Sequence, residues 1–176
     1  YYMRKMKDES LDGKKGDYGY GKGSYTQWVE LRYAEVLLGL AEAANEIGET
    51  EEGVEQIKLI RKRAGILPGE NKRYGIPENI SVDDFRTLVQ NERYIELAFE
   101  DKRYWDLRRW KLAHLELNDK ILGWNVLGEN ARTFYNNFEG PVVVWDKTKF
   151  VAPRDYLFPI KAEEAMIAGY VQNPGW

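Results

Sequence analysis

The chain has 176 residues, which suits one domain or a large part of one. Its 26 Lys and Arg against 29 Asp and Glu give a net charge of −3, which excludes the strongly basic face that nucleic-acid binding requires. Cysteine is absent, which excludes disulfides, thiolate nucleophiles and zinc–thiolate sites, and no apolar run approaches the roughly 20 residues of a membrane-spanning helix.

Residues 1–27 are rich in Gly, Lys and Tyr and predict an irregular lead-in without a helix or strand. The sequence opens at Tyr1 without an initiator Met, so we expect it to be a fragment whose export signal lies upstream. Gly16 to Lys22 match the first seven positions of a phosphate-binding loop, but Gly23 stands where magnesium binding needs Ser or Thr. A flexible loop is the better interpretation.

Residues 28–65 predict a pair of antiparallel helices, an αα-hairpin. The first helix, 28–47, has one apolar stripe and further apolar residues on a second side, which predicts packing between neighbours: Leu31, Ala34, Leu38, Ala41 and Ala44, then Val36, Leu37 and Leu40. Gly48 ends this helix, and Thr50 is the expected N-cap of the second, 51–63, which buries Val54, Ile57, Ile60 and Ala64 and stops at Gly65. A single hairpin of this kind has the format of a tetratricopeptide unit.

Residues 67–79 predict a loop, after which Ser81 caps a third helix with Asp84 as a weaker capping-box partner. The expected core face of this helix comprises Phe85, Leu88, Val89, Ile95 and Phe99. A fourth helical stretch is expected at 103–113. Beyond it, 114–176 predict loops, one strand of a small β-hairpin at 142–145 and a short helix at 162–168 closed by Gly169.

Catalytic interpretations find little support. His114 is the only histidine and lacks a nucleophile or a second ligand, so a surface or helix-end role is expected. Glu92, Glu96 and Glu100 have the spacing to share a helix face, as the two carboxylates of a glycosidase would. Nearby arginines and lysines lower the pKa of such carboxyl groups, which favours a structural ion-pair network over general acid catalysis.

The most specific stretch, 91–110, alternates charged side chains with large aromatic ones at helical spacing. It resembles the signature of the SusD/RagB family, on these residues: Glu92, Arg93, Glu96, Glu100, Arg103, Asp106, Arg108, Arg109 and Trp110. Residues 31–43 and the Arg61, Arg63, Ala64, Gly65 helix end resemble a second family element. Residues 156–160 and 172–176 resemble its last elements. Asp101 stands where the family usually has Gly, so the turn there is expected to differ.

The resemblance implies a mainly α fold: tetratricopeptide-like helical hairpins with irregular loops and a small β-hairpin. It places the C-terminal helical domain of the family at 28–176, divided into the αα-hairpin 28–65, the signature helices 81–113 and the loops, hairpin and short helix of 114–176. It also implies an outer-membrane, cell-surface lipoprotein that binds glycans or other nutrients, has no cofactor or metal, and works with a TonB-dependent transporter. A lipid anchor upstream of this chain would be its one contact with the membrane, and nucleic acid is no partner.

The loop and hairpin region supplies the residue types that bind sugars, because aromatic rings cover the C–H face while amides and guanidinium groups bond the hydroxyls. The expected ligand-binding residues are Trp124, Asn125, Arg132, Tyr135, Asn137 and Trp145. Packing of these rings onto the helices is an equally good interpretation, and Trp105 and Trp110 in the signature helix are expected in the core. Two alternatives to glycan capture stay open: a tetratricopeptide-like protein-interaction module and, less favoured, a glycoside hydrolase.

Overall fold

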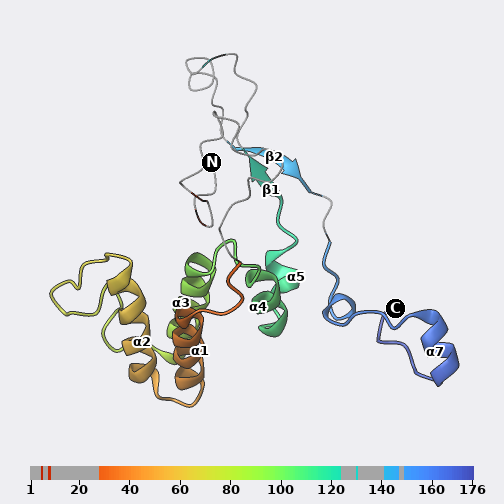
Figure 1. Ribbon diagram of the computed structural model, residues 1–176, viewed down its shortest axis with the longest axis horizontal. Coiled ribbons are helices and arrows are strands. Elements are labelled where there is room, and N and C mark those ends of the chain that lie inside the picture. Colours follow the sequence, from red (N-terminus) through yellow and green to blue (C-terminus); the bar gives the residue numbers. More distant parts are fainter. Residues whose placement is uncertain (1–4, 6–7, 9–27, 124–129, 131–140, 147–148) are drawn as a thin grey trace. The chain divides into compact units, whose positions relative to one another are not determined.

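The computed structural model describes residues 5, 8, 28–123, 130, 141–146 and 149–176. They fall into two compact units, Tyr1–Arg103 and Tyr104–Trp176, each of which is considered by itself. The described residues are mainly helical and include one small antiparallel hairpin, as predicted (Figure 1). The finer subdivision of 28–176 proposed from the sequence stays a prediction.

The first unit is built on the expected αα-hairpin, formed by α1 (Tyr33–Glu46) and α2 (Thr50–Arg63). Gly48 takes a φ of +86° between them, a left-handed conformation that glycine adopts without strain. The predicted N-cap role of Thr50 is wrong: its hydroxyl donates to Asn45 Oδ1 at 2.8 Å, and Glu49 occupies the cap position. Asn45 is itself buried and donates to the Val82 carbonyl at 2.9 Å, so it joins the end of α1 to the start of the third helix.

The third helix, α3 (Val82–Glu96), begins as predicted at Ser81, whose hydroxyl accepts a hydrogen bond from the Asp84 amide at 3.1 Å. It packs its Phe85 and Val89 face into the core of the first unit, while Ile95 and Phe99 are 63% and 64% exposed, against prediction. Ile95 lies six residues after Val89 and so points roughly 120° away from the buried face. Phe99 follows the end of the helix at a φ of +65°.

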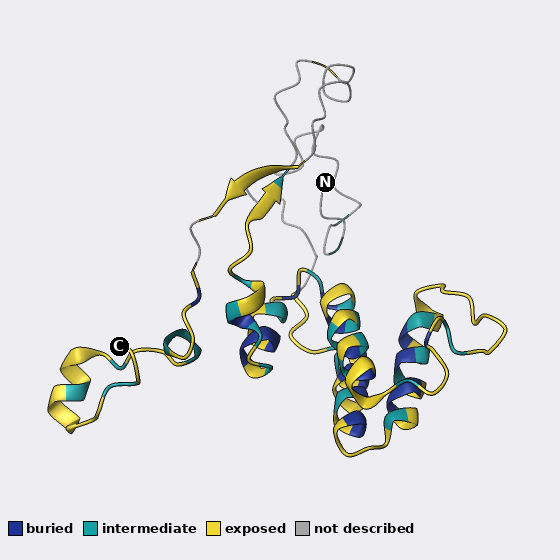
Figure 2. Ribbon diagram, turned by 180° about the vertical axis from the view of Figure 1, so that it is seen from behind, coloured by how far each residue is buried: buried dark blue, intermediate teal, exposed yellow. Residues whose placement is uncertain are grey.

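The core of the first unit lies where α1, α2 and α3 face one another (Figure 2). It contains most of the predicted stripe residues of α1 and α2, although Leu31 and Ala64 are exposed because they lie outside the two helices. The buried cluster comprises Leu37, Leu38, Ala41, Val54, Ile57, Ile60, Ile76, Phe85, Val89 and Leu97. Ile76 comes from the loop after α2, which is thereby held against the hairpin.

At Gly53, α2 approaches α1 and Phe85 closely. A Cβ built there would lie 2.7 Å from a ring carbon of Phe85 and 2.8 Å from the Ala41 carbonyl oxygen. We therefore expect Gly53→Ala to destabilise the protein by about 1–3 kcal/mol, although alanine favours helix over glycine by about 1 kcal/mol. Gly39→Ala in α1 is the matched control, since nothing lies within 4 Å of its Cβ, and it should stabilise. Urea unfolding followed by circular dichroism compares the two, and equal effects would contradict the close contact.

The second unit contains shorter elements: α4 (Arg103–Arg109, which begins at the boundary), α5 (Ala113–Glu116), β1 (Ile121–Gly123), β2 (Val142–Trp145), the 3-10 turn η2 (Arg154–Tyr156) and α7 (Ala162–Ala168). The predicted helix 103–113 is interrupted because Lys111 adopts a φ of +60°. Leu107, Ala113 and Phe150 form a small core, with Tyr156 packed against it. β2 pairs antiparallel with β1, which confirms the predicted strand and hairpin.

The end of the chain folds back on the segment before α7. The Gln172 side chain both accepts from the Ile160 amide and donates to its carbonyl, each at 2.8 Å. Trp176 Nε1 donates to the carbonyls of Arg154 and Leu157 at 3.1 and 3.0 Å. α7 ends at Gly169 as predicted, and almost all its residues are exposed (Figure 2).

Candidate functional site

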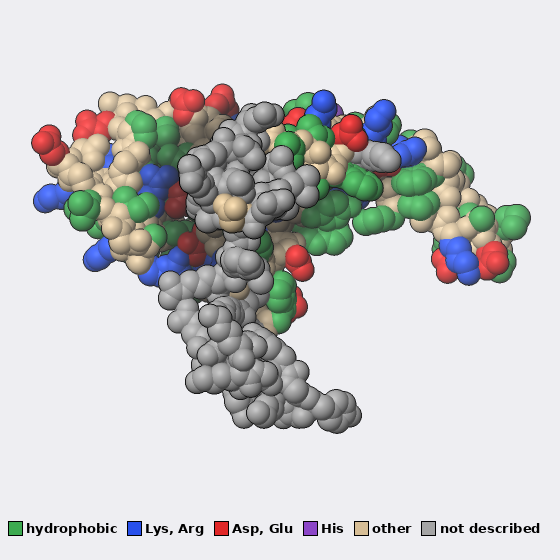
Figure 3. Space-filling view, turned by 90° about the horizontal axis from the view of Figure 1, so that it is seen from above, with side chains coloured by type: hydrophobic (Ala, Val, Ile, Leu, Met, Phe, Trp, Pro, Cys, Tyr) green, Lys and Arg blue, Asp and Glu red, His purple; other side chains and the backbone are tan. Residues whose placement is uncertain are grey.

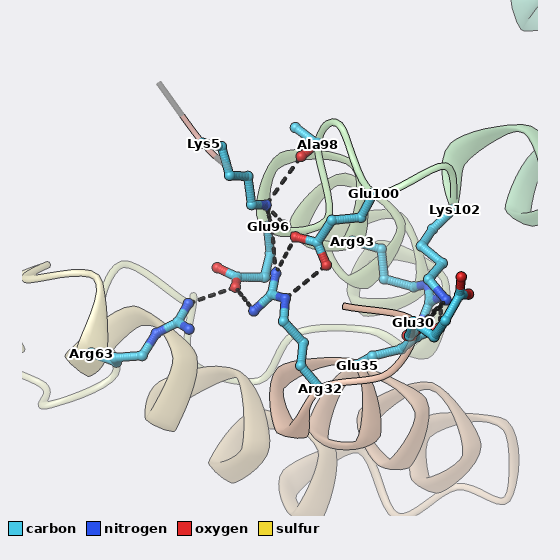
Figure 4. A network of polar contacts seen from close by, with 10 residues as sticks. All are labelled: Lys5, Glu30, Arg32, Glu35, Arg63, Arg93, Glu96, Ala98, Glu100 and Lys102. Carbon is cyan, nitrogen blue, oxygen red and sulfur yellow. Dashed lines mark hydrogen bonds and ion pairs between the residues drawn. The ribbon is translucent and has the colours of Figure 1, made fainter. Parts of the chain in front are cut away.

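Two carboxylates of the signature stretch, Glu96 and Glu100, sit in a dense ionic cluster of the first unit (Figure 4). Arg32, just before α1, donates from Nε and Nη2 to the two oxygens of Glu100, at 2.7 and 2.8 Å. The same guanidinium reaches Glu96, with Nη1 at 2.5 Å from Oε1 and Nη2 at 2.7 Å from the carbonyl. A fork of this kind is the strongest form of carboxylate recognition because both bonds are charge-assisted.

Two further cations complete this cluster, which we call the carboxylate clamp: Lys5, Arg32, Arg63, Glu96 and Glu100. Arg63, at the end of α2, donates to Glu96 Oε1 at 2.6 Å. Lys5 donates to the carbonyls of Glu96 and Ala98 at 2.8 and 3.0 Å and pairs with Glu100. The clamp therefore ties the start of α1, the end of α2 and the end of α3 together. Sequence reasoning missed Arg32 and Lys5 as partners of these carboxylates, because both lie far from the signature along the chain.

The electrostatics of the clamp oppose acid–base chemistry. Burial works to raise the pKa of Glu96, but hydrogen bonds from Arg63 and Arg32 outweigh it and hold that pKa below its usual value. The pKa of Glu100 is likewise raised by burial and lowered further by its bonds to Arg32 and Lys5, with a net decrease. A general acid needs the opposite shift. The predicted ion-pair network is confirmed for these two residues.

The lowered pKa values predict acid sensitivity of the first unit. In the unfolded chain Glu96 and Glu100 have pKa values near about 4.3, so their contribution to stability is complete above that pH. It is lost as the pH falls through the lower folded-state pKa values. We expect the urea midpoint, read by far-UV circular dichroism, to fall between about pH 4.5 and 3. The decline should be shallower in Glu100→Gln, and an identical decline would contradict this assignment.

The remaining charges of the signature in the first unit are also paired. Glu92 accepts from Arg61 Nε and Nη2 at 3.0 and 2.8 Å, and this joins α3 to α2. Glu35 in α1 lies 3.2 Å from the Lys102 ammonium and 3.9 Å from the Arg93 guanidinium. The Arg103 guanidinium stacks over the Tyr94 ring at 4.4 Å. These contacts show that the signature residues help to hold the first unit together.

In the second unit, the buried Arg108 holds the chain near η2 against α4. Its Nη1 donates to the Tyr104 hydroxyl at 2.9 Å and the Asp155 carbonyl at 2.6 Å, and its Nη2 donates to the Tyr156 carbonyl at 2.6 Å. The guanidinium also lies over the Phe158 ring, 4.6 Å from its centroid. We call this set the Arg108 cradle: Tyr104, Arg108, Asp155, Tyr156 and Phe158.

Arg109, the last residue of the same short helix, has a side chain that is 45% exposed. Arg109 pairs with Asp106 at 3.0 Å and stacks over the Trp110 ring at 4.7 Å. Trp105 is 57% exposed, so its predicted place in the core is wrong. The reason is geometric: Leu107 and Arg108 face the core in the two turns of α4, which leaves Trp105 on the opposite side.

Of the predicted ligand-binding residues, Trp145 alone lies within the described residues. Trp124, Asn125, Arg132, Tyr135 and Asn137 lie outside them, so the structure does not bring the set together and the prediction stays open. Trp145 ends β2 and is 50% exposed. Ile121, Leu122 and the three valines of β2 are also at least 42% exposed, so the hairpin presents apolar side chains. Hydrophobic side chains are visible at the surface among the charged ones (Figure 3).

His114 lies in α5, and its Nδ1 is 2.7 Å from the Tyr156 hydroxyl. Across the ranges that the structure describes, no His, Asp and Glu cluster could hold a metal ion. Within the same ranges, no helix combines the length and apolar character needed to cross a bilayer. Asp101, in the place of the family's glycine, has a φ of +56°, so the left-handed turn is formed with aspartate.

Comparison with known proteins agrees with the signature. The family model described as "SusD family" matches residues 1–176. SusD-like protein P2 of Formosa agariphila is 35% identical over 159 residues, 89% of this chain and 27% of that protein. SusD-like protein P38 of the same organism is 37% identical over 91 residues, 50% of this chain and 18% of that protein.

Two solved structures share the fold. The crystal structure of a SusD-like protein from Bacteroides fragilis matches with a TM-score of 0.64 and 28% identity, over 86% of this chain and 26% of that one. A SusD homolog from Bacteroides thetaiotaomicron matches with a TM-score of 0.58 and 28% identity, over 87% and 28% of the two chains. The chain thus spans about a quarter of the length of the first relatives it matches. With the family model covering every residue, this chain belongs to the SusD family.

Proposed function

We propose that this chain is part of a non-catalytic surface protein that captures an oligosaccharide or another nutrient and passes it to a TonB-dependent outer-membrane transporter. The observation that carries the proposal is the match to the SusD family along the whole chain. A surface location at the outer membrane, through a lipid anchor elsewhere in the full-length protein, belongs to the same proposal. No cofactor or metal is part of it.

The proposed binding region comprises the β-hairpin and the segment between its strands. A sugar offers a face of C–H groups that an aromatic ring can cover, and the half-exposed Trp145 is accessible for such stacking. The neighbouring amide, guanidinium and phenol groups would replace water at the sugar hydroxyls. These are Asn125, Arg132, Tyr135 and Asn137, with Trp124 as a second ring.

The absence of catalysis is proposed from the state of the carboxylates. Glycoside hydrolysis needs one carboxyl group that stays protonated near neutral pH and a second one across the sugar. Glu96 and Glu100 are held ionised by three cations and are largely buried in the clamp. This supports binding rather than turnover.

Titration calorimetry of the full-length protein with a panel of oligosaccharides tests the proposal. For a bound sugar, Trp145→Ala should weaken affinity about tenfold or more, as loss of a central aromatic contact does. Trp105→Ala is the matched control, a similarly exposed tryptophan outside the proposed region, and should leave affinity unchanged. A failure to bind any glycan in a broad panel, or release of reducing sugar that Glu96→Gln abolishes, would overturn the proposal.

A further inference from the structure

The β-hairpin of the second unit has no buried face that would fix its direction. Every aliphatic side chain of β1 and β2, and that of Trp145, is at least 42% exposed. Two paired strands are only marginally stable in water unless another element supports them. Support is therefore expected at the base of the hairpin, where the chain enters β1 from α5 and where it leaves β2 (Figure 1).

The side chain of Asn118 fastens the two ends of the hairpin at this base. Its Oδ1 accepts a hydrogen bond from the Phe150 amide at 2.6 Å, and its Nδ2 donates to the Phe150 carbonyl at 3.0 Å. The same Nδ2 donates to the carbonyl of His114 in α5 at 2.8 Å. The carboxamide thus bonds both backbone groups of Phe150, as a residue on a neighbouring antiparallel strand would. We call this set the Asn118 clasp: His114, Asn118 and Phe150.

The clasp connects the exposed hairpin to the buried part of the second unit. Phe150 is 8% exposed and belongs to the small core with Leu107 and Ala113. Its ring centroid lies 4.7 Å from that of Tyr156, in an edge-to-face arrangement. The three bonds of the clasp need one acceptor and two donors on a short side chain, and a carboxamide supplies both. Aspartate would keep the acceptor and lose both donors.

The clasp also closes the stretch that is proposed to bind the ligand. Asn118 and Phe150 are 32 positions apart, and all six residues expected to contact a ligand lie between them. Trp145 is one of these six and ends β2, shortly before Phe150. A binding side chain whose direction is fixed before the ligand arrives loses less conformational entropy on binding.

We propose that Asn118 is a positioning residue of the binding region, which sets the direction of the β-hairpin, and with it that of Trp145, without contacting the ligand. The effect of Asn118 on ligand affinity rests on the proposed function. Its effect on the hairpin rests on the hydrogen bonds of the clasp alone, so the two effects are measured separately.

Hydrogen exchange of the full-length protein, read by mass spectrometry without ligand, measures the hold on the hairpin. In Asn118→Ala the amides of 119–123 and 141–146 should exchange about tenfold or more faster than in the wild type. Asn118→Asp should shift the rates in the same direction, because both donors are lost. Asn118 is itself exposed, so both variants leave the small core intact.

Gln172→Ala is the matched control. The Gln172 side chain bonds the amide and the carbonyl of Ile160 in the same way, in the terminal segment of the same unit. This variant therefore removes an equivalent pair of hydrogen bonds, and the hairpin amides should exchange at the wild-type rate.

Fluorine NMR of protein labelled with fluorotryptophan reads the direction of Trp145, since the resonance that is lost in Trp145→Phe belongs to it. This resonance should broaden or shift in Asn118→Ala and stay in place in Gln172→Ala. In calorimetry with a glycan that the wild type binds, Asn118→Ala should weaken affinity about threefold or more, and Gln172→Ala should leave it unchanged.

Wild-type exchange rates together with an unmoved Trp145 resonance in Asn118→Ala would overturn the proposal. Equal losses of affinity in Asn118→Ala and Gln172→Ala would also overturn it, because they indicate general destabilisation of the second unit. A hairpin that exchanges faster with unchanged glycan affinity would overturn the positioning role. If the wild type binds no glycan, the proposed function fails, while the exchange rates still decide whether Asn118 directs the hairpin.

Discussion

Replacing Arg108 by lysine is expected to destabilise the second unit by about 3 kcal/mol, although the charge is kept. Arg108 is 9% exposed, and its guanidinium makes three hydrogen bonds within the Arg108 cradle, two of them at 2.6 Å to backbone carbonyls. Hydrogen bonds from a charged donor contribute about 1.5–3 kcal/mol each, and a buried carbonyl left without a donor adds a further cost. An ammonium group cannot reproduce the planar fork that reaches both carbonyls.

The rings around Arg108 add to this effect. Its guanidinium lies 4.6 Å from the centroid of Phe158, 5.3 Å from that of Tyr104 and 5.7 Å from that of Phe150. A planar cation stacks on such rings better than an ammonium group does. The small core of Leu107, Ala113 and Phe150 offers little other support for the chain near η2. Loss of the cradle should therefore release that segment.

The measurement is urea unfolding followed by tryptophan fluorescence, since five of the six tryptophans belong to residues 104–176. The matched control is Arg109→Lys on the same helix, where the side chain is 45% exposed and pairs with Asp106. Since lysine keeps the charge next to Asp106 and the Arg109 side chain is open to solvent, this substitution should cost under about 1 kcal/mol. Similar shifts in the two variants would show that Arg108 acts as a general charge and not through the fork.

The helices could be predicted from the sequence because apolar spacing and helix-ending glycines depend only on residues close together in the chain. The αα-hairpin, the Ser81 cap, the strand at 142–145 and the helix ended by Gly169 all follow from neighbours in the chain. Errors occurred where a residue outside the local pattern decides the outcome. Thr50 bonds Asn45 rather than the helix end, and the left-handed Lys111 divides a stretch that looked continuous.

The clamp could be predicted only in part. Paired carboxylates among cations indicated an ion-pair network, but the partners of Glu100 lie 68 and 95 positions away along the chain, at Arg32 and Lys5. No periodicity connects such positions, because they meet only after α1 and α3 have packed. The exposure of Trp105 has a similar origin: its place in the signature helix suggested a core residue, whereas the short α4 buries just one side.

Removal of the charge at Glu100 is the second change with a large expected effect. Glu100 is 3% exposed. It accepts hydrogen bonds from Nε and Nη2 of Arg32, and it also pairs with the Lys5 ammonium. Glu100→Gln keeps the shape but leaves Arg32 to share Glu96 with Arg63. Removing one member of a buried pair costs about 3–5 kcal/mol, and since the Arg32 side chain is 22% exposed we expect about 2–3 kcal/mol.

A double variant distinguishes the attraction between Arg32 and Glu100 from the cost of leaving Arg32 without that carboxylate. Arg32→Met combined with Glu100→Leu removes both charges, and well-packed apolar pairs often equal buried ion pairs in stability. We expect this combination to recover more than half of the loss in Glu100→Gln, measured by urea unfolding with far-UV circular dichroism. Glu55→Gln, in the exposed pair with Lys58, is the surface control and should cost under about 0.5 kcal/mol. If the double variant were less stable than Glu100→Gln, the attraction between Arg32 and Glu100 would itself stabilise the fold. The role of Glu100 would then not be limited to pairing an otherwise unpaired buried cation.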